Sequence, residues 1–154
     1  MRRSKQSGRP LATNKRARHN YEILEKMEAG IVLLGTEVKS AREGRVQLKD
    51  SYVEIRDGEA FLVGAHISPF SHGNRQNHDP ERPRKLLLNR REIDRLFGRT
   101  TIHGQTCIPL SMYLKKNRIK LEIALAKGRK LYDKRQAARE KELDKEARDA
   151  IGRG

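Results

Sequence analysis

Few residues of this chain have the types and spacing that metal binding needs. His66, His72, His78 and Asp79 could be drawn together as a metal cluster. The gap of five residues between His72 and His78 matches no common ligand spacing. The chain has a single cysteine, so a pair of cysteine ligands cannot complete a metal site. We interpret these histidines as hydrogen-bonding or surface residues, and we expect no metal site.

The cysteine, Cys107, could be offered as a nucleophile with His103 as its base, four residues earlier. It stands, however, in a stretch where apolar and polar residues alternate, from Thr106 to Leu114, and this pattern predicts a strand in which Cys107 is a small core residue. No paired carboxylates beside a histidine and no glycine-rich phosphate loop occur in the sequence. Catalysis therefore has no support, and we expect neither an enzyme nor a cofactor.

The basic residues offer a different chemistry, the neutralisation of phosphates. The 154 residues include 35 Lys and Arg against 20 Asp and Glu, which leaves a formal charge of +15. Phosphates that are neutralised release their counterions, so this charge favours a nucleic acid as partner. Aromatic residues make up only 5% of the chain, which favours recognition of the RNA backbone and shape over stacking on bases.

Three groups of basic residues stand apart along the sequence. Each alone could be a solvated charge run, but together they predict an RNA or DNA surface. Their members are Lys15, Arg16, Arg18 and His19; Arg82, Arg84, Lys85, Arg90 and Arg91; and Lys127, Arg129, Lys130, Lys134 and Arg135.

The charge distribution predicts how the chain is divided. Residues 1–20 carry seven basic residues and no acid, and we expect them to be a basic N-terminal extension. Residues 21–128 are nearly balanced in charge and are predicted to form the globular body, followed by a charged tail at 129–154. There is no apolar run of membrane-spanning length and no apolar leader, and the lone thiol suits a reducing compartment, so we expect a cytoplasmic protein.

The body contains mostly strand patterns. Strands are expected at 21–34, 46–56, 59–67, 106–114 and 119–125, with Asp57-Gly58 as a two-residue hairpin turn and Pro109 at an edge or a bulge. One helix is predicted at 37–42, capped by Thr36 and stopped by Gly44. Another should begin with the capping box of Asn89 and Glu92 and end at Gly98. Several short strands with two helices favour a small barrel, which has no exposed edge.

The tail differs from the body because 14 of the 22 residues from 129 to 150 are charged. Oppositely charged pairs such as Asp144 and Arg148 lie four residues apart, but each contributes only about 0.2–0.5 kcal/mol to a helix. The apolar stripe is too thin to bury. We therefore expect a tail that is disordered when free and helical when bound.

Several short motifs resemble those of the SsrA-binding protein family (small protein B). They follow one another in unbroken order over about residues 14–135, and they occupy 14–21, 28–31, 35–40, 49–52, 73–74, 77–80, 84–88, 124–128 and 133–135. The resemblance implies a mainly β fold, a small OB-fold-like β-barrel with two or three short helices. It also implies a non-enzymatic protein that binds transfer-messenger RNA and delivers it to stalled ribosomes for trans-translation.

The resemblance further implies the partners and the binding residues. The partners would be the tRNA-like domain of transfer-messenger RNA, the ribosomal RNA of the A site and mRNA channel, and, indirectly, the GTPase elongation factor that delivers aminoacyl-tRNA; we expect a monomer with no membrane contact. Together with the basic groups, it assigns RNA binding to Lys15, Arg16, Arg18, His19, Glu28, Gly30, Lys39, Arg84, Lys85, Leu87, Asn89, Lys120, Lys127, Gly128, Arg129 and Lys130. It assigns the decoding centre and the vacant mRNA channel to the tail residues Tyr132, Asp133, Lys134, Arg135, Arg139, Lys141 and Lys145. Glu28 would accept hydrogen bonds from RNA or hold a neighbouring arginine.

The chain departs from the family pattern at three positions. Arg129 replaces the first lysine of the usual Gly-Lys-Lys motif, which here is Gly128-Arg129-Lys130. Tyr132 replaces a histidine that is frequent in the family, and Phe70 replaces a frequent tyrosine. None of these changes removes a formal positive charge at neutral pH. Two other functions stay open on the residues alone: a ribosomal or ribosome-assembly protein with a basic tail, and an RNA-processing nuclease that uses His78 and Asp79.

Overall fold

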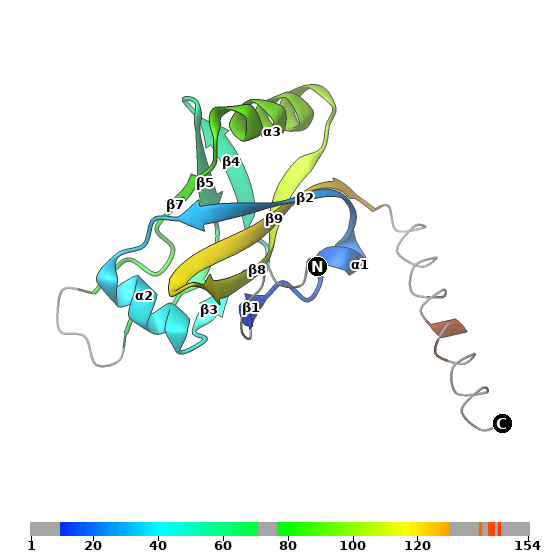
Figure 1. Cartoon of the computed structure of the whole chain (residues 1–154). Coiled ribbons are helices and arrows are strands. Elements are labelled where there is room, and N and C mark those ends of the chain that lie inside the picture. The colour runs from blue at the N-terminus through cyan, green and yellow to red at the C-terminus, as the bar shows by residue number, and fades with distance from the viewer. Residues whose placement is uncertain (1–9, 71–76, 130–138, 140–141, 144, 146–154) are drawn as a thin grey trace.

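The fold is mainly β, and a curved antiparallel sheet is its frame (Figure 1). The computed structural model describes residues 10–70, 77–129, 139, 142, 143 and 145. Its elements are β1 (Pro10–Thr13), α1 (Ala17–Asn20), β2 (Tyr21–Ile31), α2 (Gly35–Arg42), β3 (Val46–Gln47), β4 (Tyr52–Arg56), β5 (Glu59–Val63), β6 (His66–Ile67), β7 (Arg84–Leu87), α3 (Arg90–Ile102), β8 (Thr106–Lys115) and β9 (Arg118–Gly128).

Seven strands form the sheet in the order β1-β8-β9-β2-β7-β5-β4, while β3 and β6 pair separately. The sheet curves so that β4 also lies near β8, although no ladder of hydrogen bonds joins the two strands. Helices α2 and α3 lie at opposite ends of the sheet (Figure 1). This is the small OB-like fold with short helices that the sequence predicted.

Two hairpin turns form where their residue types require them. Asp57 (φ 51°) and Gly58 (φ 77°) join β4 to β5, and Lys116 (φ 51°) and Asn117 (φ 65°) join β8 to β9. A two-residue turn with both φ angles positive matches the right-handed twist of the strands, and Asp, Asn and Gly tolerate it best. The predicted turn at Asp57-Gly58 is confirmed.

The expected strands at 46–56 and 59–67 are each interrupted. Asp50 (φ 60°) and Gly64 (φ 87°) take the left-handed conformation, which divides the strands into β3 and β4 and into β5 and β6. A Cβ atom on Gly64 would lie 3.3 Å from the carbonyl oxygen of Asp50, so the two bends pack closely against each other. The first predicted strand is also shorter than expected, because β2 ends at Ile31.

Helix α3 begins as predicted but ends later. The side chain of Asn89 accepts a hydrogen bond from the Glu92 N–H at 2.8 Å, and Glu92 accepts one from the Asn89 N–H at 3.0 Å. The expectation that Gly98 ends the helix is wrong, because α3 continues to Ile102 and the left-handed residue is Gly104 (φ 68°). A glycine inside a helix costs only about 1 kcal/mol relative to alanine, which does not suffice to stop it.

Helix α2 is capped by a residue other than the one expected. It begins at Gly35, and the carboxylate of Glu37 accepts a hydrogen bond from the N–H of Leu34 at 2.7 Å. The prediction that Thr36 caps this helix is wrong, because its hydroxyl is hydrogen-bonded to His78 at 2.8 Å. Gly44 (φ 77°) follows the helix end, as expected.

Residues 10–20 belong to the folded body. Strand β1 pairs with β8, and Ala17 is 3% exposed in a small second core with Ile108 and Ala124. The part of the expected N-terminal extension that the structure describes is thus packed on the sheet. The register of β8 shifts between Pro109 and Ser111 against β9, which confirms the predicted bulge.

The main core lies inside the curve of the sheet and contains Cys107. This residue is 1% exposed, and burial raises the pKa of its thiol to about 12. A thiol that stays protonated is a poor nucleophile, so the interpretation of Cys107 as a small core residue is confirmed.

Candidate nucleic-acid interface

A long strand pair joins basic residues that are far apart in sequence. Strands β2 and β9 pair from Tyr21 opposite Gly128 to Gly30 opposite Lys120. The N–H of Arg129 donates to the carbonyl oxygen of Asn20 at 2.9 Å, so the chain after β9 lies along α1. We call the basic residues that meet here the α1 group: Lys15, Arg16, Arg18, His19, Lys127 and Arg129.

At the other end of the same strands a second set of expected RNA-binding residues comes together. Gly30, Leu87 and Lys120 line one pocket of about 300 Å³, and Arg42 of α2 and Arg118 of β9 line it with them. We call these five residues the Gly30 group. A Cβ atom on Gly30 would lie 3.2 Å from the Cβ of Leu87, so the missing side chain lets Leu87, which is 55% exposed, pack directly on β2.

Two residues of the Gly30 group, Arg42 and Arg118, were not assigned to RNA from the sequence. Arg118 shares the polar face of its strand with Lys120, so the alternation alone could have indicated it. Arg42 lies in the last turn of α2, and only the packing of that helix beside β7 brings it to the pocket.

The two groups lie at opposite ends of β9, and the lysine that β9 contributes to each of them faces a different side of the sheet. Lys120 and Lys127 lie on β9, seven residues apart in a strand whose own register is regular. Because side chains alternate along a strand, an odd separation directs them to opposite faces. The backbone distance is about 23 Å at about 3.3 Å per residue.

Glu28 lies beside the Gly30 group and is held by two donors. The hydroxyl of Tyr113 donates to its carboxylate, and Lys115 Nζ lies 3.2 Å from it. Burial alone would raise the pKa of Glu28, but these hydrogen bonds and the charges of Lys115 and Lys120 outweigh burial and lower it. Glu28 was expected either to accept hydrogen bonds from RNA or to hold a neighbouring arginine. In the structure it holds a neighbouring cation, but that cation is Lys115 and not an arginine.

Arg84 does not lie on the RNA face where the sequence placed it. Its side chain is fully buried, with Nε 2.8 Å from Glu37 Oε2, Nη1 2.9 Å from the Ala65 carbonyl and Nη2 3.0 Å from the Pro80 carbonyl. Burial lowers the pKa of Arg84, and the carboxylate of Glu37 acts in the opposite direction. The assignment of Arg84 as an RNA contact is wrong for this structure, because no phosphate reaches a side chain enclosed in this way.

Glu37 is the centre of this buried network, and no role was predicted for it from the sequence. Besides Arg84 it accepts from Arg82 Nη2 at 2.6 Å and from the N–H of Leu34. Burial would raise the pKa of Glu37, but these hydrogen bonds lower it below its usual value. The network fixes α2, and with it Arg42 and Lys39, against β7. Glu37 and Arg84 are 47 positions apart, so no local pattern could have paired them.

Three other expected RNA-binding residues are exposed near Leu87 or on α2. Lys85 forms an ion pair with Glu59 at 3.1 Å, and the side-chain oxygen of Asn89 is used to cap α3, which leaves its amide nitrogen as a donor. The ammonium of Lys39 lies 5.6 Å from the centroid of the Phe70 ring. Each of these polar ends still faces solvent.

The tail assignments stay predictions. Lys130, Tyr132, Asp133, Lys134, Arg135 and Lys141 lie outside the described residues. Arg139 and Lys145 are helical and exposed.

The histidines have structural partners. His78 is buried, with Nε2 2.8 Å from the carbonyl oxygen of Ile67 and Nδ1 2.8 Å from the hydroxyl of Thr36, and His66 lies 3.5 Å from Glu81. His72 lies outside the described residues. Among those that are described, no three His, Cys, Asp or Glu side chains are grouped to hold a metal ion, and no helix has the length and apolarity to cross a membrane.

Comparison with known proteins identifies the family. The family model described as SmpB protein matches residues 11–153. The chain belongs to the SmpB protein family. Two relatives of this family carry the name SsrA-binding protein: that of Syntrophobacter fumaroxidans is 58% identical over 138 residues (90% of this chain, 86% of the relative), and that of Pelobacter propionicus is 55% identical over 141 residues (92% and 93%).

A solved structure extends the likeness to three dimensions. One chain of a structure described as "tmRNA-SmpB: a journey to the center of the bacterial ribosome" is 44% identical to this SmpB chain, with a TM-score of 0.67. The match covers 82% of this chain and 93% of that one. The resemblance inferred from the short motifs is thereby confirmed.

Proposed function

We propose that this SmpB chain binds transfer-messenger RNA and delivers it to ribosomes stalled on truncated messages, where the incomplete protein is tagged. Its role is binding without catalysis. The observation that carries this proposal is the pair of cationic groups at the two ends of β9, in a chain of this family. Groups at the two ends of one strand can engage two RNA surfaces at once, transfer-messenger RNA and ribosomal RNA.

The Gly30 group supports contact with a folded RNA backbone. Lys120, Arg42 and Arg118 supply charge around an exposed Leu87, which packs on Gly30 and presents an apolar contact beside these cations. We assign this group to the tRNA-like domain of transfer-messenger RNA. The α1 group and the tail are then assigned to ribosomal RNA, with the elongation factor GTPase acting indirectly and the chain acting as a cytoplasmic monomer.

The tail would occupy the decoding centre and the vacant mRNA channel. The channel is lined by phosphates, and Tyr132 to Lys145 alternates cations with acids that keep the tail from binding every RNA it meets. Too little apolar surface is available for it to fold alone, so its ordering should be coupled to the ribosome.

Truncation after Tyr132 tests this division. The shortened chain should keep its affinity for transfer-messenger RNA within about tenfold, or about 1.4 kcal/mol, and should fail to support tagging on stalled ribosomes. Lys120→Ala in the full chain is the matched control, since it should weaken RNA binding while the tail stays intact. A truncated chain that tags at the normal rate would contradict the role of the tail.

The RNA that co-purifies with the full chain tests the proposal as a whole. Sequencing it at moderate salt should return one dominant tRNA-like species. Ribosomal RNA alone would indicate a ribosomal or assembly protein, and shortened fragments produced by the chain would indicate a nuclease; either result contradicts the proposal.

A further inference from the structure

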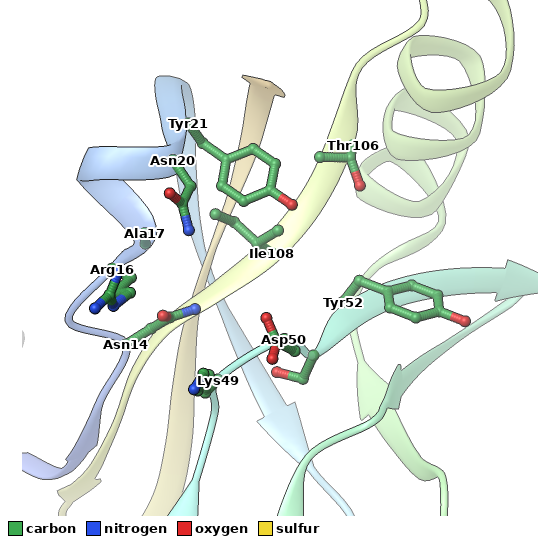
Figure 2. Close-up of a pocket in the computed structure, with 11 residues that line it drawn as sticks. Asn14, Arg16, Ala17, Asn20, Tyr21, Lys49, Asp50, Tyr52, Thr106 and Ile108 are labelled. Carbon is green, nitrogen blue, oxygen red and sulfur yellow. The ribbon is translucent and has the colours of Figure 1, made fainter. Parts of the chain in front are cut away.

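A pocket of about 270 Å³ opens beside the α1 group, between the start of β2 and the segment that precedes β4 (Figure 2). No role has been assigned to it above. Its lining includes Arg16, Tyr21, Lys49, Asp50, Tyr52 and Ile108.

The two sides of the pocket differ in chemistry. Tyr21 and Ile108 stand on one side, and the side chains of Lys49 and Asp50 lie across from them (Figure 2). Tyr21 packs against the small second core, so its ring is held in place, whereas Tyr52 points away from the centre (Figure 2). A fixed aromatic ring beside an apolar floor is a surface on which one planar base can stack.

Asp50 is the unusual member of the pocket. It is an exposed carboxylate between cationic neighbours, yet within the described part of the chain it forms no ion pair and its side chain accepts no hydrogen bond. Its backbone is held in the left-handed conformation (φ 60°), close against Gly64, which fixes where the side chain begins. Two acceptor oxygens are therefore available at a defined position in the pocket.

A carboxylate selects among the four bases. Guanine presents N1–H and the N2 amino group side by side on its Watson–Crick edge, and two parallel donors match two carboxylate oxygens. Adenine offers only one donor on that edge, next to an acceptor that a carboxylate repels. Arg16 and Lys49 stand at the rim, where they can reach the phosphates on either side of the base.

We propose that this pocket binds one unstacked guanine of an RNA partner, with Asp50 accepting from its Watson–Crick edge, Tyr21 stacking on its face, and Arg16 and Lys49 on the flanking phosphates. The inference rests on the proposed function, because it requires RNA at the α1 group. It adds a base-reading site to a surface that composition alone predicted to recognise backbone and shape only.

Nucleotide titration tests the site directly. Amide resonances of the full chain are followed by NMR while 5′-GMP, 5′-IMP or 5′-AMP is added at millimolar concentrations. GMP should shift resonances at 14–21 and 49–52 and should bind about tenfold more tightly than AMP, because each hydrogen bond to a charged group discriminates strongly. IMP, which lacks the N2 amino group, should fall between them.

Asp50→Asn is the decisive variant, and Asp57→Asn is its matched control. Both aspartates have positive φ, a conformation that asparagine accepts readily, so both variants should fold, and thermal unfolding checks this. Asp50→Asn exchanges one acceptor for a donor and should abolish the preference for GMP, while Asp57→Asn, in the β4–β5 turn, should retain it. Tyr21→Leu should weaken GMP and AMP alike.

The affinity of Asp50→Asn for each of the two RNAs, measured separately, identifies which RNA supplies the guanine. A loss of affinity of Asp50→Asn for transfer-messenger RNA assigns the base to that RNA, and a loss for ribosomes assigns it to ribosomal RNA. GMP that shifts no pocket resonance, equal binding of GMP and AMP by the wild type, or unchanged affinity of Asp50→Asn for both RNAs would overturn the site. The proposed function is judged independently, by whether the wild type binds transfer-messenger RNA at all.

Discussion

Arg84 and Lys85 are neighbours on β7, with the same charge and opposite positions. Arg84 is enclosed with Glu37 and three carbonyl groups, whereas the ammonium of Lys85 stands in solvent beside Glu59. The alternation of the strand decides which of the two builds the fold and which is available to a partner. The buried region shows that a cluster of cations in a sequence can be split between structure and binding.

The same contrast separates the Glu37 network from the cations of β9. The network holds α2 in place by ion pairs to the fully buried carboxylate of Glu37, while Lys120 and Lys127 form no ion pair with any described residue and depend on the sheet for position. Variants in the first region should therefore act on stability, and variants in the second on RNA binding with little effect on stability.

Arg84→Met should have the largest effect. It leaves the buried carboxylate of Glu37 without one of its two arginine partners, the fully buried one, and breaking a buried pair from one side costs about 3–5 kcal/mol of unfolding free energy. Urea unfolding measures the loss. Lys85→Met, one residue away, should change stability by no more than about 0.5 kcal/mol, and equal losses for the two variants would refute the contrast.

Glu37→Gln should remove part of the pH dependence of stability. The pKa of Glu37 is lower in the folded chain than its usual 4.5, so the folded state binds fewer protons and the carboxylate stabilises it at neutral pH. That contribution is lost as the pH falls from 4.5 through the folded pKa. Urea unfolding from neutral to acidic pH should give a flatter profile for Glu37→Gln than for the wild type. The exposed Glu43, changed to Gln, should leave the profile as it is.

Lys39→Ala, Lys120→Ala and Lys127→Ala should each weaken RNA binding several-fold at unchanged stability. If each ammonium neutralises a phosphate, the slope of log affinity against log salt should become shallower by about one unit per variant. Lys26→Ala, exposed near the middle of β2, is the matched control and should keep the wild-type slope. Slopes unaltered in all three variants would remove these residues from the RNA surface.

Tyr113→Phe should have the smallest effect. It removes the hydroxyl that donates to Glu28, so the pKa of Glu28 should rise towards its usual value, with a stability loss of about 1 kcal/mol. NMR titration of the glutamate carboxyl carbons measures the pKa. In Tyr52→Phe, which changes an exposed tyrosine, Glu28 should titrate as in the wild type.

The sequence predicted features that depend on neighbouring residues. Asp57-Gly58 formed its turn, Asn89 and Glu92 formed their capping box, and the alternation from Ile119 to Leu125 formed part of β9. In each case the hydrogen bonds or backbone angles are set within a few residues, so the residue types carry the information.

Features that depend on distant residues were missed or misassigned. Thr36 did not cap α2, because its hydroxyl meets His78 from another segment. The burial of Arg84 required Glu37 from α2. The α1 group likewise forms only once β2 and β9 pair, and no single segment of the sequence contains it.

Strand β9 also connects the Gly30 group and the α1 group mechanically. Its covalent backbone runs from the neighbourhood of Lys120 to Lys127, and hydrogen-bond ladders to β2 and β8 hold it on both sides. If RNAs attached at its two ends are drawn apart, the tension is carried along covalent bonds, and the flanking ladders are loaded in shear, many bonds together. Strand β9 would then transmit the force between the two RNAs, and the two ladders would resist unfolding under that force.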